Sequence, residues 1–174
     1  DVVAITGNTV IEAVQRQLPD LDARRRVLRR FDLEVDRYLL ATIHRPENTD
    51  DPDALAAILM SLELSSRHLP VVLPLHPRTA LAIERCGLDT LLQHLKVVPP
   101  LGASDFLSLA AHALVMVSDS GGLAEEVTVL KRPLVVVRRS TERAEAIEAG
   151  FARMAAPREV AATVESVLQE HRSL

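Results

Sequence analysis

The segment Asp119-Ser120-Gly121-Gly122 has the residue types of an anion-binding turn. It stands between an apolar run that predicts a strand and an amphipathic run that predicts a helix. Two glycines let the backbone approach a ligand closely, and the free N–H groups of a first helical turn attract phosphate. Ser120 would cap the helix or donate to that phosphate. A tight turn that binds nothing explains the same residues. The chain has no G-x-G-x-x-G segment, so a nicotinamide dinucleotide site loses its main support.

Charged side chains follow this turn and the next predicted strand. Glu126 lies four residues after Gly122, so it projects along the same helix face, where a carboxylate could accept hydrogen bonds from two ribose hydroxyls. An acidic residue early in a helix also simply suits the helix dipole. The loop at residues 138–143 carries arginines, which could clamp a diphosphate or could be solvated surface charges.

His44-Arg45 and His76-Pro77 each follow a predicted strand directly. Either histidine alone could be structural. The loops after parallel strands meet at one edge of the sheet, however, so the two imidazoles, the arginines and the glycine turn would share one rim. Neither histidine has the close His/Glu or His/Cys spacing of a metal site, so we predict none. Ser120 lacks a nucleophile-elbow pattern, which disfavours a hydrolase triad. The other histidines are expected at the surface or at helix ends, and these are His68, His94, His112 and His171.

Short apolar runs alternate with longer amphipathic runs from Tyr38 onward. The apolar runs predict strands at 38–43, 71–75, 96–98, 114–117, 134–137 and 151–154. Helices are expected between these strands. One begins at Pro52, one covers 77–86 and is closed by Gly87, one is capped by Ser104, one runs from the glycine turn to Leu130, one ends at Gly150, and one covers 157–171. Residues 45–51 form a polar stretch. Continuous apolar strands separated by helices predict an α/β, Rossmann-like parallel sheet with helices on both faces, spanning 38–174.

Residues 1–37 do not follow this alternation of strands and helices. A helix capped by Thr9 and an arginine-rich, solvated helix over 22–30 are expected there. We interpret 1–37 as a linker and leading helical segment, and a chain that opens at Asp1 as cut from a longer one.

Composition excludes several classes of protein. Of 174 residues, 48% are apolar and 25% charged, which is unlike a disordered chain. The net charge of −4 disfavours a nucleic-acid partner. Cys86 is the single cysteine, so no internal disulfide forms and a reducing compartment is favoured. No apolar run approaches the roughly 20 residues needed to cross a membrane. We therefore expect a cytoplasmic protein with no membrane partner.

Six segments of the chain occur in a familiar order. They are TGNTVIEAV (6–14), HRPENTDD (44–51), PLHPR (74–78), PPLGASDF (99–106), SDSGGLAEE (118–126) and RRSTERAEAIEAG (138–150). Together they closely resemble the C-terminal half of the UDP-N-acetylglucosamine 2-epimerase family of the non-hydrolysing type, over essentially the whole chain. The resemblance implies one half of a glycosyltransferase-B-type fold, in which two Rossmann-like domains face each other across a cleft. The N-terminal partner domain would lie outside this sequence.

The resemblance also implies roles for matching residues. It places His44 in catalysis, near the diphosphate and the sugar. It assigns contacts with UDP to Arg45, His76, Phe106, Ser120, Gly121, Gly122, Glu126 and Arg143. Among these, Phe106 would line the uracil pocket, Glu126 would hold the ribose hydroxyls and Arg143 would contact phosphate, while the role of His76 is less defined.

The implied reaction interconverts UDP-GlcNAc and UDP-ManNAc without a cofactor. UDP is eliminated to leave a 2-acetamidoglucal, and is then added back with C2 inverted. The acid/base carboxylates would come from the N-terminal domain, so this half alone would be inactive, and the full-length protein is expected to be a homodimer.

This sequence departs from the family pattern at two positions. Ala124 stands where the family has a glutamine and Ala144 where it has a proline, and these changes could alter loop rigidity or sugar choice. Alternatives remain: an epimerase of another UDP-sugar, a hydrolysing epimerase, a glycosyltransferase donor domain, or a non-catalytic nucleotide-sugar-binding module.

Overall fold

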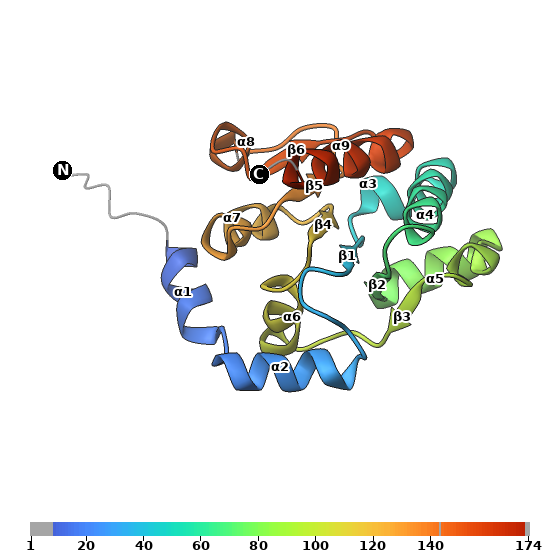
Figure 1. Cartoon of the computed structure of the whole chain (residues 1–174). Coiled ribbons are helices and arrows are strands. Elements are labelled where there is room, and N and C mark those ends of the chain that lie inside the picture. The colour runs from blue at the N-terminus through green and yellow to red at the C-terminus, as the bar shows by residue number, and fades with distance from the viewer. Residues whose placement is uncertain (1–8, 143, 173–174) are drawn as a thin grey trace, which may run out of the picture.

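The structure, a computed structural model, describes residues 9–142 and 144–172. A parallel six-stranded sheet lies at its centre, in the order β3-β2-β1-β4-β5-β6 (Figure 1). The strands are β1 (Leu39–Thr42), β2 (Val71–Pro74), β3 (Lys96–Val98), β4 (Val115–Ser118), β5 (Leu134–Val136) and β6 (Ala152–Met154). The six predicted strands and their parallel arrangement are confirmed.

Helices connect the strands and cover both faces of the sheet (Figure 1). They are α1 (Thr9–Gln17), α2 (Leu21–Arg30), α3 (Pro46–Thr49), α4 (Pro52–Ser66), α5 (Pro77–Cys86), α6 (Ala103–Ala110), α7 (Gly121–Leu130), α8 (Ala144–Glu148) and α9 (Val160–Arg172), with 3-10 turns at Asp89–Leu92 and Pro157–Glu159. α5 has the predicted bounds, and Gly87 closes it with a φ of 64°, a left-handed conformation that glycine adopts at little cost.

The two faces of the sheet bury separate apolar clusters. Leu39 belongs to a cluster shared with α4, α5 and α9, whereas the next residue, Leu40, belongs to one shared with α2, α6 and α7. Successive side chains of a strand point to opposite faces, so a strand buried on both sides reads as a continuous apolar run. This alternation explains why the strands could be recognised from the sequence.

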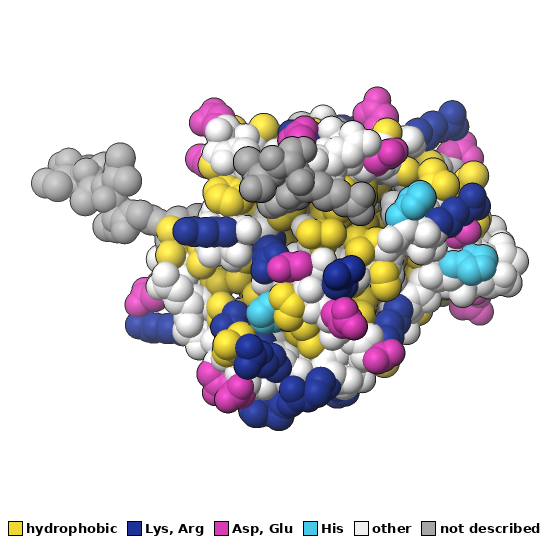
Figure 2. Space-filling view, viewed as in Figure 1, with side chains coloured by type: hydrophobic (Ala, Val, Ile, Leu, Met, Phe, Trp, Pro, Cys, Tyr) yellow, Lys and Arg dark blue, Asp and Glu magenta, His cyan; other side chains and the backbone are white. Residues whose placement is uncertain are grey.

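The leading helices pack on one face of this domain. α2 lies against α6, and α1 lies against α7 and α6. The exposed arginines of α2 form a basic edge in Figure 2, yet Val27 and Leu28 are buried. The segment is therefore amphipathic rather than solvated on all sides.

One local prediction was wrong, and two segments are more buried than their sequence indicates. The polar stretch 45–51 contains the short helix α3, whose Asn48 and Thr49 are buried by contacts with distant segments. Gly102, not Ser104, is the N-cap of α6. His112 lies just beyond the end of α6, as expected of a helix-end residue, but it is buried, with 8% of its surface exposed.

Candidate functional site

The site lies where the direction of chain winding reverses. From β1 the chain continues to β2 on one side, and from β4 it continues to β5 on the other. Thr42 and Ser118 are paired in register at the ends of β1 and β4. His44 and Ser120 therefore both emerge two residues beyond these ends. In open α/β sheets such a switch point leaves a crevice in which ligands bind.

The start of α7 forms one wall of this crevice. Ser120 is the N-cap, one of the two roles expected for it, and its hydroxyl accepts a hydrogen bond from Leu123 N at 3.4 Å. A Cβ on Gly121 would approach Glu142 Oε1 to 2.9 Å, so a larger residue there would force the Glu142 side chain to move. Gly122 is exposed, and a Cβ there would meet only Ser120 Oγ, at 3.9 Å. The N–H end of α7 is thus open to an anion on the side of Gly122.

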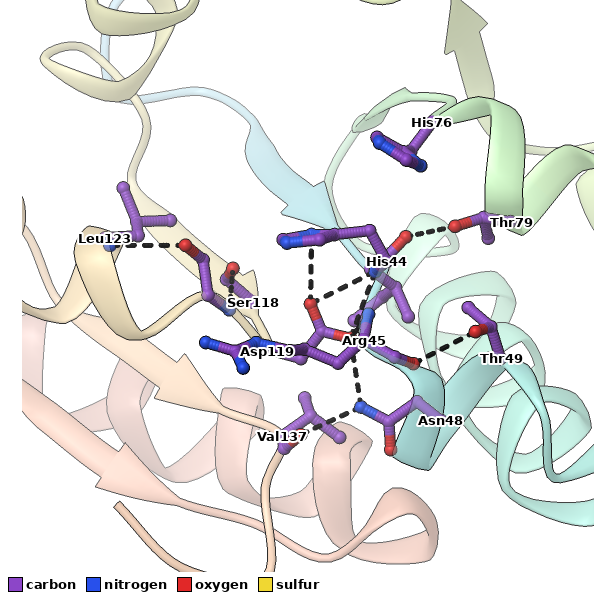
Figure 3. Close-up of polar contacts among 12 residues, drawn as sticks. His44, Arg45, Asn48, Thr49, His76, Thr79, Ser118, Asp119, Leu123 and Val137 are labelled. Carbon is purple, nitrogen blue, oxygen red and sulfur yellow. Dashed lines mark hydrogen bonds and ion pairs between the residues drawn. The ribbon is translucent and has the colours of Figure 1, made fainter. Parts of the chain in front are cut away.

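A buried carboxylate connects the loops around the crevice (Figure 3). Asp119 is fully buried. It accepts hydrogen bonds from His44 N at 3.0 Å, from Arg45 N at 2.8 Å and from Asn48 Nδ2 at 3.1 Å. Asn48 also donates to the carbonyl of Val137 at 2.9 Å. The loops after β1, β4 and β5 are thereby held together by two side chains.

Two histidines lie beside this network. The His44 and His76 rings are 5.4 Å apart between centroids. His44 Nδ1 lies 3.2 Å from Asp119 Oδ1. His76 caps α5, and its Nδ1 accepts a hydrogen bond from Arg78 N at 3.1 Å. The Thr79 hydroxyl donates to the Ile43 carbonyl and so joins α5 to the end of β1. The two imidazoles therefore come together, as the sequence predicted.

Two arginines reach the start of α7. A Cβ on Gly121 would lie 3.4 Å from Arg138 Nη1 and 3.5 Å from Arg45 Nη2. Arg138 is largely buried and pairs with Glu47 at 3.3 Å and with Glu142 at 2.9 Å. Two guanidinium groups at the positive end of a helix favour a bound diphosphate.

A hollow of about 820 Å³ lies on the same edge of the sheet. It is bordered by Asn48 and Arg138 on the side of the site, and by Asp51, Arg139 and Ala156 beyond them. It does not enclose the histidine pair.

Comparison with known proteins identifies the family. The model of the family described as UDP-N-acetylglucosamine 2-epimerase matches residues 1–174. The chain belongs to this family. The UDP-N-acetylglucosamine 2-epimerase of Methanococcus maripaludis is 31% identical over 179 residues, which cover 98% of this chain and 49% of that relative. This chain thus spans about half the length of the curated relatives that it matches.

A solved structure and a second relative are also similar to this epimerase-family chain. The crystal structure of UDP-GlcNAc 2-epimerase from Methanocaldococcus jannaschii, in complex with UDP-GlcNAc and UDP, matches with a TM-score of 0.83 and 29% identity, covering 95% of this chain and 48% of that one. The UDP-2,3-diacetamido-2,3-dideoxy-D-glucuronate 2-epimerase of Pseudomonas aeruginosa is 41% identical over 116 residues, 66% of this chain and 32% of that relative. The fold is half of a glycosyltransferase-B-like epimerase fold.

The remaining predicted residues lie on the α6 and α7 side of the epimerase domain. Phe106, in the first turn of α6, packs against the apolar cluster that includes Leu123. Glu126, in the second turn of α7, is half-buried, and burial together with the charge of Glu125 raises its pKa. No hydrogen bond or ring contact joins Phe106 or Glu126 to the histidine pair in the described part of the chain. Arg143 falls outside the described residues, so its assignment stays a prediction.

Sequence reasoning singled out the turn but missed two members of this network. The sequence pattern identifies Asp119 only as part of the glycine turn, and Asn48 only as part of a polar stretch. A charged residue directly after a buried strand was the available signal for Asp119.

Among residues 9–142 and 144–172, no group of three His, Cys, Asp or Glu side chains is arranged to hold a metal ion. None of the helices described there is long and apolar enough to span a membrane.

Proposed function

We propose that this chain is the UDP-binding half of an enzyme that interconverts UDP-GlcNAc and UDP-ManNAc. The observation that carries the proposal is the family match over residues 1–174. The open N-terminus of α7, with Arg45 and Arg138 beside it, supports the proposal because this arrangement suits a diphosphate.

The bound nucleotide would lie along the carboxyl edge of the sheet. The diphosphate would accept hydrogen bonds at Ser120, Gly121 and Gly122, with Arg45 and Arg143 as its cationic partners. Phe106 would pack on the uracil, and Glu126 would accept from the ribose hydroxyls. His44, with His76 next to it, would stand near the bond between the diphosphate and the sugar. The proposed reaction uses no redox cofactor, because its elimination and addition steps transfer no hydride.

Elimination removes the proton from C2 and breaks the bond between C1 and the UDP oxygen, whose electron pair stays on the diphosphate. Addition of UDP to the resulting 2-acetamidoglucal, with a proton delivered to the opposite face of C2, gives the epimer. The charge that develops on the leaving diphosphate is stabilised by the helix N-terminus and the arginines. In this scheme the groups that move the C2 proton belong to the other half of the enzyme.

We also propose how this half fits into the complete protein. Residues 1–37 would be a linker and leading helical segment, and 38–174 the UDP-binding domain. A cleft with a single wall cannot exclude water or surround the leaving group. The chain alone should therefore bind UDP weakly and be inactive, and the complete enzyme would be a cytoplasmic homodimer.

A second substrate is favoured by one observation. The identity with the diacetamido-glucuronate epimerase, 41% over 116 residues, exceeds the 31% found with the UDP-GlcNAc enzyme. An epimerase of a UDP-diacetamido-uronate is therefore the alternative. Incubating the complete enzyme with each UDP-sugar and separating the products distinguishes the two. Free ManNAc would indicate a hydrolysing enzyme, sugar transfer to an acceptor a glycosyltransferase, and absence of any turnover a binding module.

Calorimetry with the 174-residue chain and UDP tests nucleotide binding directly. We expect UDP to bind weakly and saturably, and UDP-GlcNAc to compete with UDP for the same site. A folded sample that gives no heat with UDP at millimolar concentration would contradict the proposed function.

A further inference from the structure

We propose that Asp119 is a positioning residue that fixes His44 as the tautomer with its proton on Nδ1. Nε2 is then the atom that His44 offers to a ligand in the crevice. This inference deepens the proposed function and rests on it for the identity of the ligand, but the contacts that carry it belong to this chain alone.

The Asp119 carboxylate is surrounded by donors. Its side chain is fully buried, and a buried carboxylate is stable only where hydrogen bonds replace its hydration. Two backbone N–H groups, of His44 and Arg45, and the side-chain amide of Asn48 donate to it. An ionised carboxylate can only accept hydrogen bonds.

The remaining neighbour of this carboxylate is the His44 ring. Nδ1 of that ring lies 3.2 Å from Asp119 Oδ1, and Figure 3 shows the ring over the carboxylate. An unprotonated Nδ1 would place its lone pair against a negative oxygen, which is repulsive. A protonated Nδ1 is attracted instead. In the neutral ring the other nitrogen, Nε2, therefore carries the lone pair.

The neighbouring His76 is held in the opposite state. Its Nδ1 accepts a hydrogen bond from the backbone N–H of Arg78 at the start of α5. A nitrogen that accepts cannot carry the proton, so neutral His76 is protonated on Nε2. Two imidazoles whose centroids are 5.4 Å apart thus present different atoms, an acceptor on His44 and a donor on His76. A ligand with one donor and one acceptor would be oriented by this pair.

The charge of Asp119, and not only its shape, is required for this assignment. In Asp119→Asn one oxygen becomes an NH₂ group. That group must face one of the surrounding donors, and the His44 ring can adapt by moving its proton from Nδ1 to Nε2. The backbone N–H groups of His44 and Arg45 cannot adapt in this way. The substitution should therefore change the His44 tautomer while the remaining oxygen still accepts from the backbone.

Nitrogen-15 NMR of the 174-residue chain tests the proposal without any ligand. Long-range correlation spectra, recorded above pH ~6.5 so that free imidazole is mostly neutral, show which ring nitrogen is protonated. His44→Gln assigns the His44 signals by deletion. We expect His44 to carry its proton on Nδ1 and His76 on Nε2, with the exposed His68 as an internal reference. A wild-type His44 protonated on Nε2 would overturn the proposal.

Two variants separate positioning from general support of the fold. Asp119→Asn should move the His44 proton to Nε2 and leave the His76 signals unchanged. Asn48→Ala removes another donor to the same carboxylate but keeps the contact with His44, so its His44 tautomer should be that of the wild type. A folded Asp119→Asn chain with an unchanged tautomer would refute the role of Asp119. If that variant does not fold, the wild-type spectrum decides. Failure of UDP to bind in calorimetry would instead refute the proposed function and leave the tautomer result standing.

Discussion

The carboxylate of Glu142 lies against Gly121 at the start of α7, since a Cβ on Gly121 would meet Glu142 Oε1 at 2.9 Å. The other carboxylate oxygen lies 2.9 Å from Arg138 Nη1. A negative side chain therefore lies where we propose that the diphosphate binds. Glu142 and the diphosphate would compete for the same positive groups.

Removing the charge of Glu142 should strengthen UDP binding. Glu142→Gln keeps the size of the side chain but no longer repels a diphosphate or neutralises Arg138. Because an exposed ion pair is worth about 0.2–1 kcal/mol, we expect a gain of up to about fivefold in affinity, measured by calorimetry. Glu145→Gln, on an exposed position of α8, makes the same change in net charge and should have little effect. Weaker binding by Glu142→Gln would show that this carboxylate supports the site.

The two glycines of the turn should respond differently to alanine. At Gly122 a Cβ meets only Ser120 Oγ at 3.9 Å, so Gly122→Ala should raise the free energy of unfolding by about 0.4–1 kcal/mol, through lower entropy of the unfolded chain. Gly121→Ala should gain less than this, or lose stability, since the side chain of Glu142 must move. Urea unfolding of both variants provides the measurement. Equal stabilisation would mean that the space beside Gly121 is larger than the structure shows.

Glu126 should contribute to nucleotide affinity rather than to the fold. Loss of its hydrogen bonds to the ribose in Glu126→Ala should cost about 1.5–3 kcal/mol of binding free energy. UDP titration of the variant, compared with the neighbouring Glu125→Ala, gives the measurement. Arg143→Ala should weaken binding in the same way. Unchanged affinity in both Glu126→Ala and Arg143→Ala would contradict the assigned binding face.

Acidification should destabilise the chain through His112. Its ring nitrogens are buried and have no hydrogen-bond partner in the described structure. Burial, followed by the charges of Arg24 and Arg132, lowers its pKa, although Asp36 opposes this effect. The unfolded chain then binds a proton near pH 6.5 while the folded chain does not, so stability falls as pH drops from about 6.5 towards the lowered folded-state pKa.

Urea unfolding over this pH range checks the role of His112. His112→Gln removes the titrating group and should flatten the pH dependence, while the exposed His68→Gln should leave it as in the wild type. The same pH slope in His112→Gln would assign the effect to another group.

Local chemistry made most of the fold predictable. The helix over 77–86 begins at a proline, has apolar residues on one face and ends at Gly87, and each of these signals acts within a few residues. Capping was one of two roles expected for Ser120, because a hydroxyl before a helix start has a nearby N–H to accept from. Such local signals act in the same way in any fold that buries the same face of the helix.

The burial of Asn48, Thr49 and His112 has a different cause. Asn48 and Thr49 are polar, and nothing near them in the sequence indicates burial. They are buried because Asp119, Val137 and Arg78 satisfy their hydrogen bonds. The turn that holds His112 is likewise held by residues distant in sequence, since Asp36 N donates to the His112 carbonyl and Arg132 Nε donates to the Ala111 carbonyl.

The sequence by itself determined the alternation of strands and helices, the glycine turn and the order of the motifs, because backbone preferences and apolar periodicity are local properties. Which side chains meet was decided only by the tertiary structure. Asp119 contacts His44 and Asn48 from more than seventy residues away. A carboxylate can remain charged inside a protein only where donors from several segments converge on it, and that convergence exists only once β1, β4 and β5 lie side by side.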